Sequence, residues 1–163
     1  MDRLWSPWRY DYIKSGSAEK SEPPACVFCA MLEAEGDDES KYIVHRAARN
    51  FIVLNIYPYI SGHTMVVPYA HLAELAAAPK ETTDEMMDLA KRLQAVMREV
   101  YRPDGFNLGM NLGRAAGAGV ADHFHLHLMP RWTGDTNFMT TVGETRVHPE
   151  DLSTTYQKLR EKF

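Results

Sequence analysis

Asp122-His-Phe-His-Leu-His-Leu-Met-Pro130 is the stretch of the 163-residue chain that decides the fold. Histidine alternates with apolar residues in it, and a period of two is typical of a β-strand. The three histidines are therefore expected on one face of a strand: His123, His125 and His127. The apolar residues between them are expected to point the other way, into a core. A glycine-rich loop at 113–120 precedes the stretch, and imidazoles beside free backbone N–H groups indicate either a metal site or chemistry on an anionic ester.

Three roles for these histidines have to be compared. Packing alone is a weak explanation, because the chain has only seven histidines and half-buried imidazoles need hydrogen-bond partners. A catalytic metal held by all three would have Asp122 as its nearest carboxylate and would leave the glycine loop without a role. A nucleophilic role uses both features. One neutral imidazole attacks a phosphorus atom, loop N–H groups hold its oxygens, and a neighbouring histidine donates to the leaving group.

The composition limits the class of protein. A chain of 163 residues with 45% hydrophobic and 25% charged residues fits one globular domain with a short arm. The net charge of −4 argues against nucleic acid as a partner, because counterion release needs a basic surface. The sequence has no apolar run of about 18 residues and no signal-peptide pattern, so we expect no membrane association and a cytoplasmic location. The expected divisions are an aromatic arm at 1–14, a linker at 15–25 and one domain at 26–163.

The two cysteines, Cys26 and Cys29, are spaced C-x-x-C. In a reducing compartment this spacing indicates a metal knuckle or a redox dithiol rather than a structural disulfide. No thioredoxin-like strand and helix surround the pair, so zinc is the favoured interpretation, with the redox role and no special role still open. A zinc site needs two further ligands from elsewhere in the chain.

The remaining pattern predicts an α+β fold with an antiparallel sheet. Thr82 and Glu85 form a capping-box pattern at the start of one long amphipathic helix, which ends at Arg102-Pro103. A single helical turn is expected at 31–34, and a C-terminal helix is expected to start at Pro149. Four further strands are expected from short apolar runs, at 42–45, 51–55, 63–68 and 106–112.

Gly62-His63 before an apolar strand, together with His123-Phe-His-Leu-His-Leu-Met129, resembles the signature of the histidine triad (HIT) superfamily of nucleotide hydrolases and transferases. The resemblance implies a HIT-like fold, a homodimer whose sheets continue across the interface, and a purine-nucleotide pocket. It also implies that His125 is the nucleophile that forms a nucleotidyl-histidine. His127 is then expected to contact the phosphate or leaving group, and His63 to lie in the same pocket.

Other residues match positions that hold the nucleotide in this family. Asn55 is expected at the ribose, and Trp132 either stacks near the base or packs in the core. The phosphates are expected at a set on or beside the glycine loop: Asn111, Gly117, Ala118, Gly119 and Val120.

The cysteine pair resembles the knuckle of a bacterial branch of the family with a structural zinc. In that branch the other two ligands match His71 and His123, which gives a closed site with two thiolates and two imidazoles. No redox cofactor is implied.

Four segments resemble the branch that contains bacterial diadenosine tetraphosphate phosphorylases and fragile-histidine-triad-like proteins: 4–9, 55–59, 105–113 and 130–138. The implied reaction is nucleotidyl transfer from a dinucleoside polyphosphate to water, giving AMP, or to phosphate, giving ADP. The loop Gly117-Ala-Gly-Val120 departs from the family pattern. It has neither the glutamine of the phosphoramidase and fragile-histidine-triad branches nor the Gly-Ser of the phosphorylases. A nucleoside phosphoramidase and a non-catalytic nucleotide-binding adaptor or sensor are the alternatives.

Overall fold

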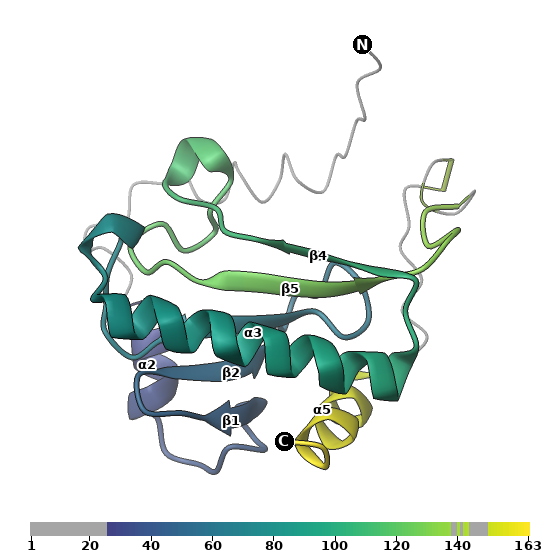
Figure 1. Cartoon of the computed structure of the whole chain (residues 1–163), viewed down its shortest axis with the longest axis horizontal. Helices are drawn as coiled ribbons and strands as arrows, with labels where there is room; N and C mark the ends of the chain where they lie inside the picture. Colours follow the sequence, from purple (N-terminus) through teal and green to yellow (C-terminus); the bar gives the residue numbers. More distant parts are fainter. Residues whose placement is uncertain (1–25, 138–139, 141, 144–149) are drawn as a thin grey trace.

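The computed structural model describes residues 26–137, 140, 142–143 and 150–163. The expected arm, the linker and Pro149 lie outside the described residues. Five antiparallel strands form one sheet in the order β1-β2-β3-β5-β4 (Figure 1). The strands are β1 Ile43–Arg46, β2 Asn50–Leu54, β3 Thr64–Pro68, β4 Gly105–Gly109 and β5 Leu126–Arg131. The α-helices within the described residues are α2 Val27–Glu33, α3 Lys80–Tyr101 and α5 Leu152–Arg160, with 3-10 turns at Leu75–Ala77 and Arg114–Ala116. The expected α+β architecture is confirmed.

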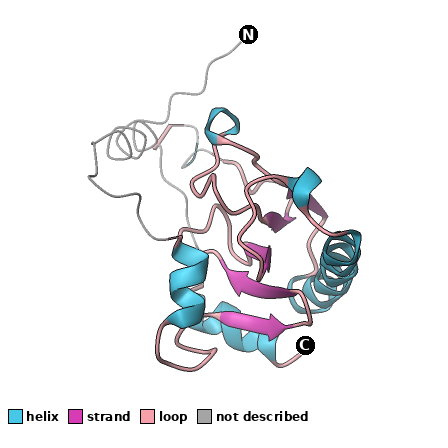
Figure 2. Ribbon diagram, turned by 90° about the vertical axis from the view of Figure 1, so that its left-hand side faces the viewer, coloured by secondary structure: helices cyan, strands magenta, loops and turns pink. Residues whose placement is uncertain are grey.

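The two faces of the sheet are covered by different helices. The larger core joins α3 and α5 to one face and includes Phe124, Leu126 and Leu128. The smaller core lies on the other face, where Phe28 of α2 packs with Val53 and Met65. In Figure 2 the long helix and α2 accordingly lie on opposite sides of the strands. Within the described residues, no helix is both long and apolar enough to span a bilayer.

The register of β5 confirms the alternation expected from the sequence. His127 is paired with Met65 of β3, and Met65 with Val53 of β2, so the His127 side chain shares the face of the smaller core. The strand itself is shorter than expected, because the ladder with β3 starts only at Leu126. Before that point the N–H of Phe124 donates to the carbonyl of Leu72 at 2.7 Å instead of to β3.

The β4 strand also ends earlier than expected, at Gly109 rather than at residue 112. Gly109 is paired with His127, close to the start of β5. Only Leu126 of β5 remains beyond this pair, so Asn111 and Leu112 have no strand residue opposite them and the ladder cannot continue through them.

The expected capping box at Thr82 is wrong. The long helix begins at Lys80, after Pro79, whose φ of −56° already suits a helix. The Glu85 carboxylate does not bond back to a cap residue. It accepts two backbone N–H groups of the β1–β2 turn, at 3.1 and 2.8 Å, and the Asn50 side-chain amide at 2.8 Å. The Glu85 carboxylate, which the local pattern assigned to the helix cap, is therefore used in a tertiary contact instead.

The two short helices also begin at different residues from those expected. The Asp151 carboxylate caps α5 by accepting the N–H of Thr154 at 2.7 Å, so that this helix starts at Leu152 rather than at residue 149. Directly after Cys26, α2 starts at Val27 and extends through the single turn expected at 31–34.

Candidate active site and metal-binding cluster

Three histidines meet on the smaller-core side of the sheet, at the junction of β3 and β5. His63, directly before β3, is 1% exposed, and His125 and His127 are 5% and 7% exposed. The ring of His127 lies 5.0 Å from that of His63 and 4.6 Å from that of His125, measured between centroids. The structure therefore brings together the three residues expected to be catalytic.

The backbone fixes which nitrogen of His125 carries the proton. Its Nδ1 lies 3.0 Å from the carbonyl oxygen of His123. A carbonyl can only accept, so Nδ1 is the protonated nitrogen and Nε2 of the neutral ring keeps its lone pair. Nε2 is the atom that a nucleophile needs.

A chain of hydrogen bonds gives His127 the opposite arrangement. The backbone N–H of Tyr59 donates to Nδ1 of His63 at 3.1 Å. Nε2 of His63 must then hold the proton that it donates to Nδ1 of His127 at 2.9 Å. His127 is left with a proton on Nε2, so a lone pair and an N–H donor are presented by neighbouring rings.

Burial keeps these rings neutral near pH 7. Burial, with repulsion from the His127 and His125 rings, lowers the pKa of His63 to about 3. Burial and the His125 ring lower the pKa of His127 to about 4. The pKa of His125 is also lowered by burial, against the opposing effect of its bond to the His123 carbonyl. Neutral imidazoles are the form in which the bonding pattern above can exist.

The second group, which we call the Cys2His2 cluster, consists of Cys26, Cys29, His71 and His123. Its four ligand atoms lie within 4.8 Å of one another. Nδ1 of His123 is 3.3 Å from Cys26 Sγ and 3.7 Å from Cys29 Sγ, and Nδ1 of His71 is 3.5 Å from Cys29 Sγ. Sulfur and nitrogen ligands of a tetrahedral zinc ion are separated by about 3.6 Å. The three sulfur–nitrogen separations therefore fit the ligands of such an ion.

The orientation of His123 also suits a metal ligand. Its Nε2 donates to the carbonyl of Pro68 at 2.9 Å, which leaves the lone pair of Nδ1 directed at the sulfurs. Burial lowers the pKa of His123, which favours the neutral ring that a metal requires.

The glycine loop lies near these groups through Val120, which packs against the smaller core that contains Phe28. Two of its four expected phosphate donors are already used, because Gly117 donates to Arg114 at 2.9 Å and Ala118 to Gly113 at 3.4 Å. In the described part of the chain, the N–H groups of Gly119 and Val120 make no backbone hydrogen bond. They are the loop donors that remain for an anion.

The other expected nucleotide residues lie around this site with mixed roles. Asn55 accepts the N–H of Tyr57 at 2.9 Å and its amide lies 3.4 Å from Nδ1 of His63, so it helps to build the loop beside the histidines. Asn111 is half-buried just after β4. Trp132 is half-buried and packs edge-on against Tyr101 at 6.3 Å, with Nε1 donating to its carbonyl at 3.4 Å. These contacts favour packing for Trp132.

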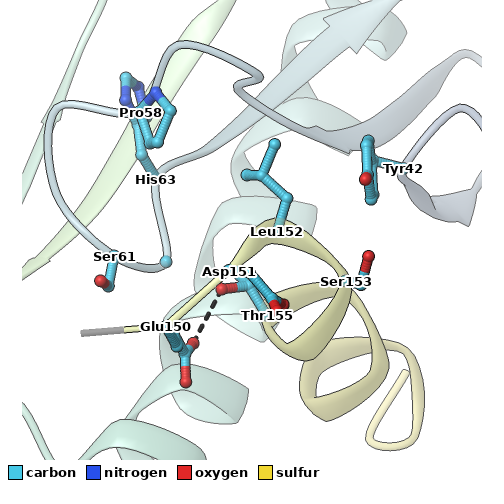
Figure 3. Close-up of a pocket in the computed structure, with 10 residues that line it drawn as sticks. Tyr42, Pro58, Ser61, His63, Glu150, Asp151, Leu152, Ser153 and Thr155 are labelled. Carbon is cyan, nitrogen blue, oxygen red and sulfur yellow. Dashed lines mark hydrogen bonds between the residues drawn. The ribbon is translucent and has the colours of Figure 1, made fainter. Parts of the chain in front are cut away.

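A pocket of about 470 Å³ lies between the loop that ends in His63 and the start of α5 (Figure 3). Glu150 and Asp151 line it, and the Glu150 carboxylate accepts the Thr155 hydroxyl at 2.8 Å. Two carboxylates make it unsuitable for a polyphosphate, so we expect the nucleotide near the glycine loop instead.

Two functional contacts were not apparent from the sequence. The Tyr59 N–H and the Pro68 carbonyl set the proton positions of His63 and His123. Both are main-chain groups, and no residue type signals such a role.

Residues 37–134 match the family described as "HIT domain". The chain is 38% identical to a protein of Mycobacterium tuberculosis named AP-4-A phosphorylase, over 98% of this chain and 83% of that protein. It is 33% identical to an adenosine 5'-monophosphoramidase of Saccharomyces cerevisiae, over 71% of this chain and 68% of that protein. A zinc-bound histidine triad family protein from Mycobacterium smegmatis has a similar structure, with a TM-score of 0.68, 29% identity, and coverage of 85% of this chain and 92% of that one.

Proposed function

Because the chain belongs to the HIT domain family, we propose that it is an enzyme that transfers a nucleotidyl group from a dinucleoside polyphosphate through an intermediate on His125. The observation that supports this most directly is the difference between two neighbouring rings: His125 has a free lone pair on Nε2, whereas His127 has an N–H donor on Nε2. The similarity to the mycobacterial AP-4-A phosphorylase indicates diadenosine tetraphosphate as the first substrate to test.

In the first step Nε2 of His125 attacks the α-phosphorus of the substrate. The new N–P bond forms as the P–O bond to the distal portion breaks, and ATP leaves from diadenosine tetraphosphate. The N–H of His127 donates to an oxygen of the phosphate or leaving group. The His123 carbonyl, bonded to Nδ1–H of His125, stabilises the positive charge that develops on the substituted ring.

In the second step an oxygen of inorganic phosphate attacks the phosphorus and the N–P bond breaks, which gives ADP and restores His125. Water in place of phosphate gives AMP. The N–H groups of Gly119 and Val120 would hold the non-bridging oxygens in both steps.

Product analysis tests the proposal. The protein is incubated with diadenosine tetraphosphate, with and without inorganic phosphate, and the nucleotides are separated by chromatography. We expect ADP and ATP in the presence of phosphate. AMP and ATP at a phosphate-independent rate would replace phosphorolysis by hydrolysis, and binding without any product would favour the sensor role.

A phosphoramidase activity is the second candidate, supported by the similarity to the yeast adenosine 5'-monophosphoramidase. The same His125 attack would then expel an amine. Comparison of kcat/KM for adenosine 5'-phosphoramidate and diadenosine tetraphosphate distinguishes the two functions.

We further propose that the Cys2His2 cluster holds a structural zinc ion. Two thiol and two imidazole ligands form a closed set with no position for a substrate, and the cytoplasm, where we place the protein, keeps such thiols reduced. When bound, the ion would link α2 to the segments around His71 and His123. Metal analysis after purification without added zinc should give about one equivalent per chain for this four-ligand set.

The proposed homodimer is supported by the free edge of the sheet. On its outer side β4 has no neighbour among the described residues. Leu108 of this strand is 48% exposed, and Leu112, beyond its end, is 38% exposed. Joining two such edges would continue the sheet and cover these side chains. Sedimentation equilibrium should give twice the chain mass, and Leu108→Glu should shift it towards the monomer.

A further inference from the structure

We propose that Phe28 and His123 are positioning residues for His125, so that the Cys2His2 cluster controls the rate of nucleotidyl transfer as well as the stability of the fold. The inference rests on the proposed role of His125 as nucleophile. If the cluster only stabilised the fold, disrupting it would leave the rate unchanged in protein that remains folded.

Phe28 connects the cluster to the nucleophile by direct contact. It lies on α2 between the two cysteines and is 5% exposed. Its ring meets the rings of His123 and His125 edge-on, with centroid distances of 5.3 and 5.1 Å. Edge-on contacts prefer particular ring orientations, so Phe28 limits the rotation of His125. The cysteines on either side of Phe28 hold it in place.

His123 provides a second connection through the backbone. Its ring faces the sulfurs through Nδ1, and its own carbonyl accepts the Nδ1–H of His125 at 3.0 Å. The group that sets the proton position of the nucleophile therefore belongs to a ligand of the cluster. If the contacts among the cluster residues are lost, Phe28 and the His123 carbonyl are both held less firmly in position.

These contacts affect the reaction through the orientation of Nε2 of His125. Attack on phosphorus requires the lone pair in line with the bond that breaks, and a misplacement of about 1 Å can cost on the order of 100-fold in rate. Substrate binding does not depend on the orientation of this lone pair. A loss of positioning should therefore lower kcat and leave KM nearly unchanged.

The first test is Phe28→Leu, which removes the edge contacts and keeps all four ligands. Its matched control is Phe51→Leu, since Phe51 is 0% exposed in the same smaller core and packs against Tyr69 rather than a site histidine. We expect Phe28→Leu to lower kcat about tenfold with KM within about twofold. Phe51→Leu should lower the melting temperature similarly and leave kcat unchanged. Equal kcat values for the two folded variants would overturn the proposal, as would a change in KM alone.

The second test reads the nucleophile without substrate. Long-range ¹⁵N imidazole spectra should show His125 protonated at Nδ1 alone in the zinc-loaded wild type. We expect a mixture of Nδ1- and Nε2-protonated forms in zinc-loaded Phe28→Leu, and in chelator-treated wild type that keeps its circular dichroism. Adding zinc back should restore the wild-type signal, and metal analysis should show that Phe28→Leu still binds one equivalent.

An unchanged His125 signal in Phe28→Leu would overturn the positioning role, and this variant decides the question if the metal-free protein unfolds. Absence of turnover in the wild type would instead reject the proposed function. The spectra report on His125 in either case, so the two failures can be told apart.

Discussion

Two clusters contain histidines from the segment that leads into β5, and histidine serves a different purpose in each cluster. In the Cys2His2 cluster, His123 donates from Nε2 to the Pro68 carbonyl and directs a lone pair at two thiols. In the other cluster, Nδ1 of His63 accepts the Tyr59 N–H, and Nε2 of His63 donates to Nδ1 of His127. The contrast shows that the backbone group on one ring nitrogen determines what the other nitrogen can do.

His125 stands between the two clusters and combines their features. Its Nδ1 is bonded to a carbonyl, as Nε2 of His123 is, and its ring packs against that of His127, with centroids 4.6 Å apart. Substitutions in each cluster distinguish a role in the reaction from a role in stability.

The largest effect is expected for His125→Ala. Removal of the nucleophile should lower kcat by at least about 10³-fold and abolish the nucleotidyl-protein intermediate. Turnover of diadenosine tetraphosphate and trapping of labelled protein measure these effects. His45→Ala is the control, because His45 packs against Phe163 at 5.1 Å, outside both clusters, and its loss should leave kcat within about twofold. A nearly normal rate in His125→Ala would place the chemistry elsewhere.

Loss of a thiol from the Cys2His2 cluster should act on stability in addition to its effect on the rate. Cys29→Ser should reduce the free energy of unfolding by about 3 kcal/mol or more, because metal binding contributes directly to folding. Urea denaturation with and without a chelator measures this. The chelator should destabilise the wild type and have little effect on the variant. A wild type that is insensitive to the chelator would contradict a metal at this site.

His63→Phe should interrupt the bonding chain without removing the nucleophile. His127 would lose its Nδ1 partner and no longer be held with its proton on Nε2, so kcat should fall by about 100-fold, or about 2.7 kcal/mol. His63→Gln supplies an amide N–H in place of the imidazole donor and should recover part of the rate. Equal rates for the two variants would show that the hydrogen bond to His127 is not what His63 contributes.

The smallest effect concerns pH. The pKa of His63 falls from 6.5 in the unfolded chain to about 3 in the folded protein, so below pH 6.5 the unfolded state binds more protons. The corresponding stability is complete above pH 6.5 and is lost as pH falls towards the folded value. Between pH 7 and 5 the wild type should lose about 2 kcal/mol more than His63→Phe, measured by urea denaturation. Parallel pH profiles would contradict the burial of a neutral His63.

Sequence periodicity was a sufficient guide to the faces of β5 and of the residues that lead into it. Phe124, Leu126 and Leu128 entered the core as the alternation predicted, because a residue's side of a strand depends only on its position. The association of Cys26 and Cys29 with His71 and His123 came from family resemblance, since separations of 42 to 97 residues carry no local signal.

The failures have one cause. The Glu85 carboxylate was expected at a helix cap but is held by the β1–β2 turn, and β5 starts late because Phe124 bonds to Leu72. Each depends on a partner that is distant in the sequence. Likewise, the proton positions of His63 and His123 follow from main-chain groups that any residue could supply. Local patterns cannot identify partners of this kind.

The spacing of His123, His125 and His127 limits how this protein can change through evolution. Inserting or deleting one residue between them would turn every later side chain of the segment to the opposite side of the sheet. The ring of His123, which faces the thiols, and the ring of His125 would then be separated in a single genetic event. Descendants of this chain can therefore diverge here by replacing residues, while the length of the segment stays constant.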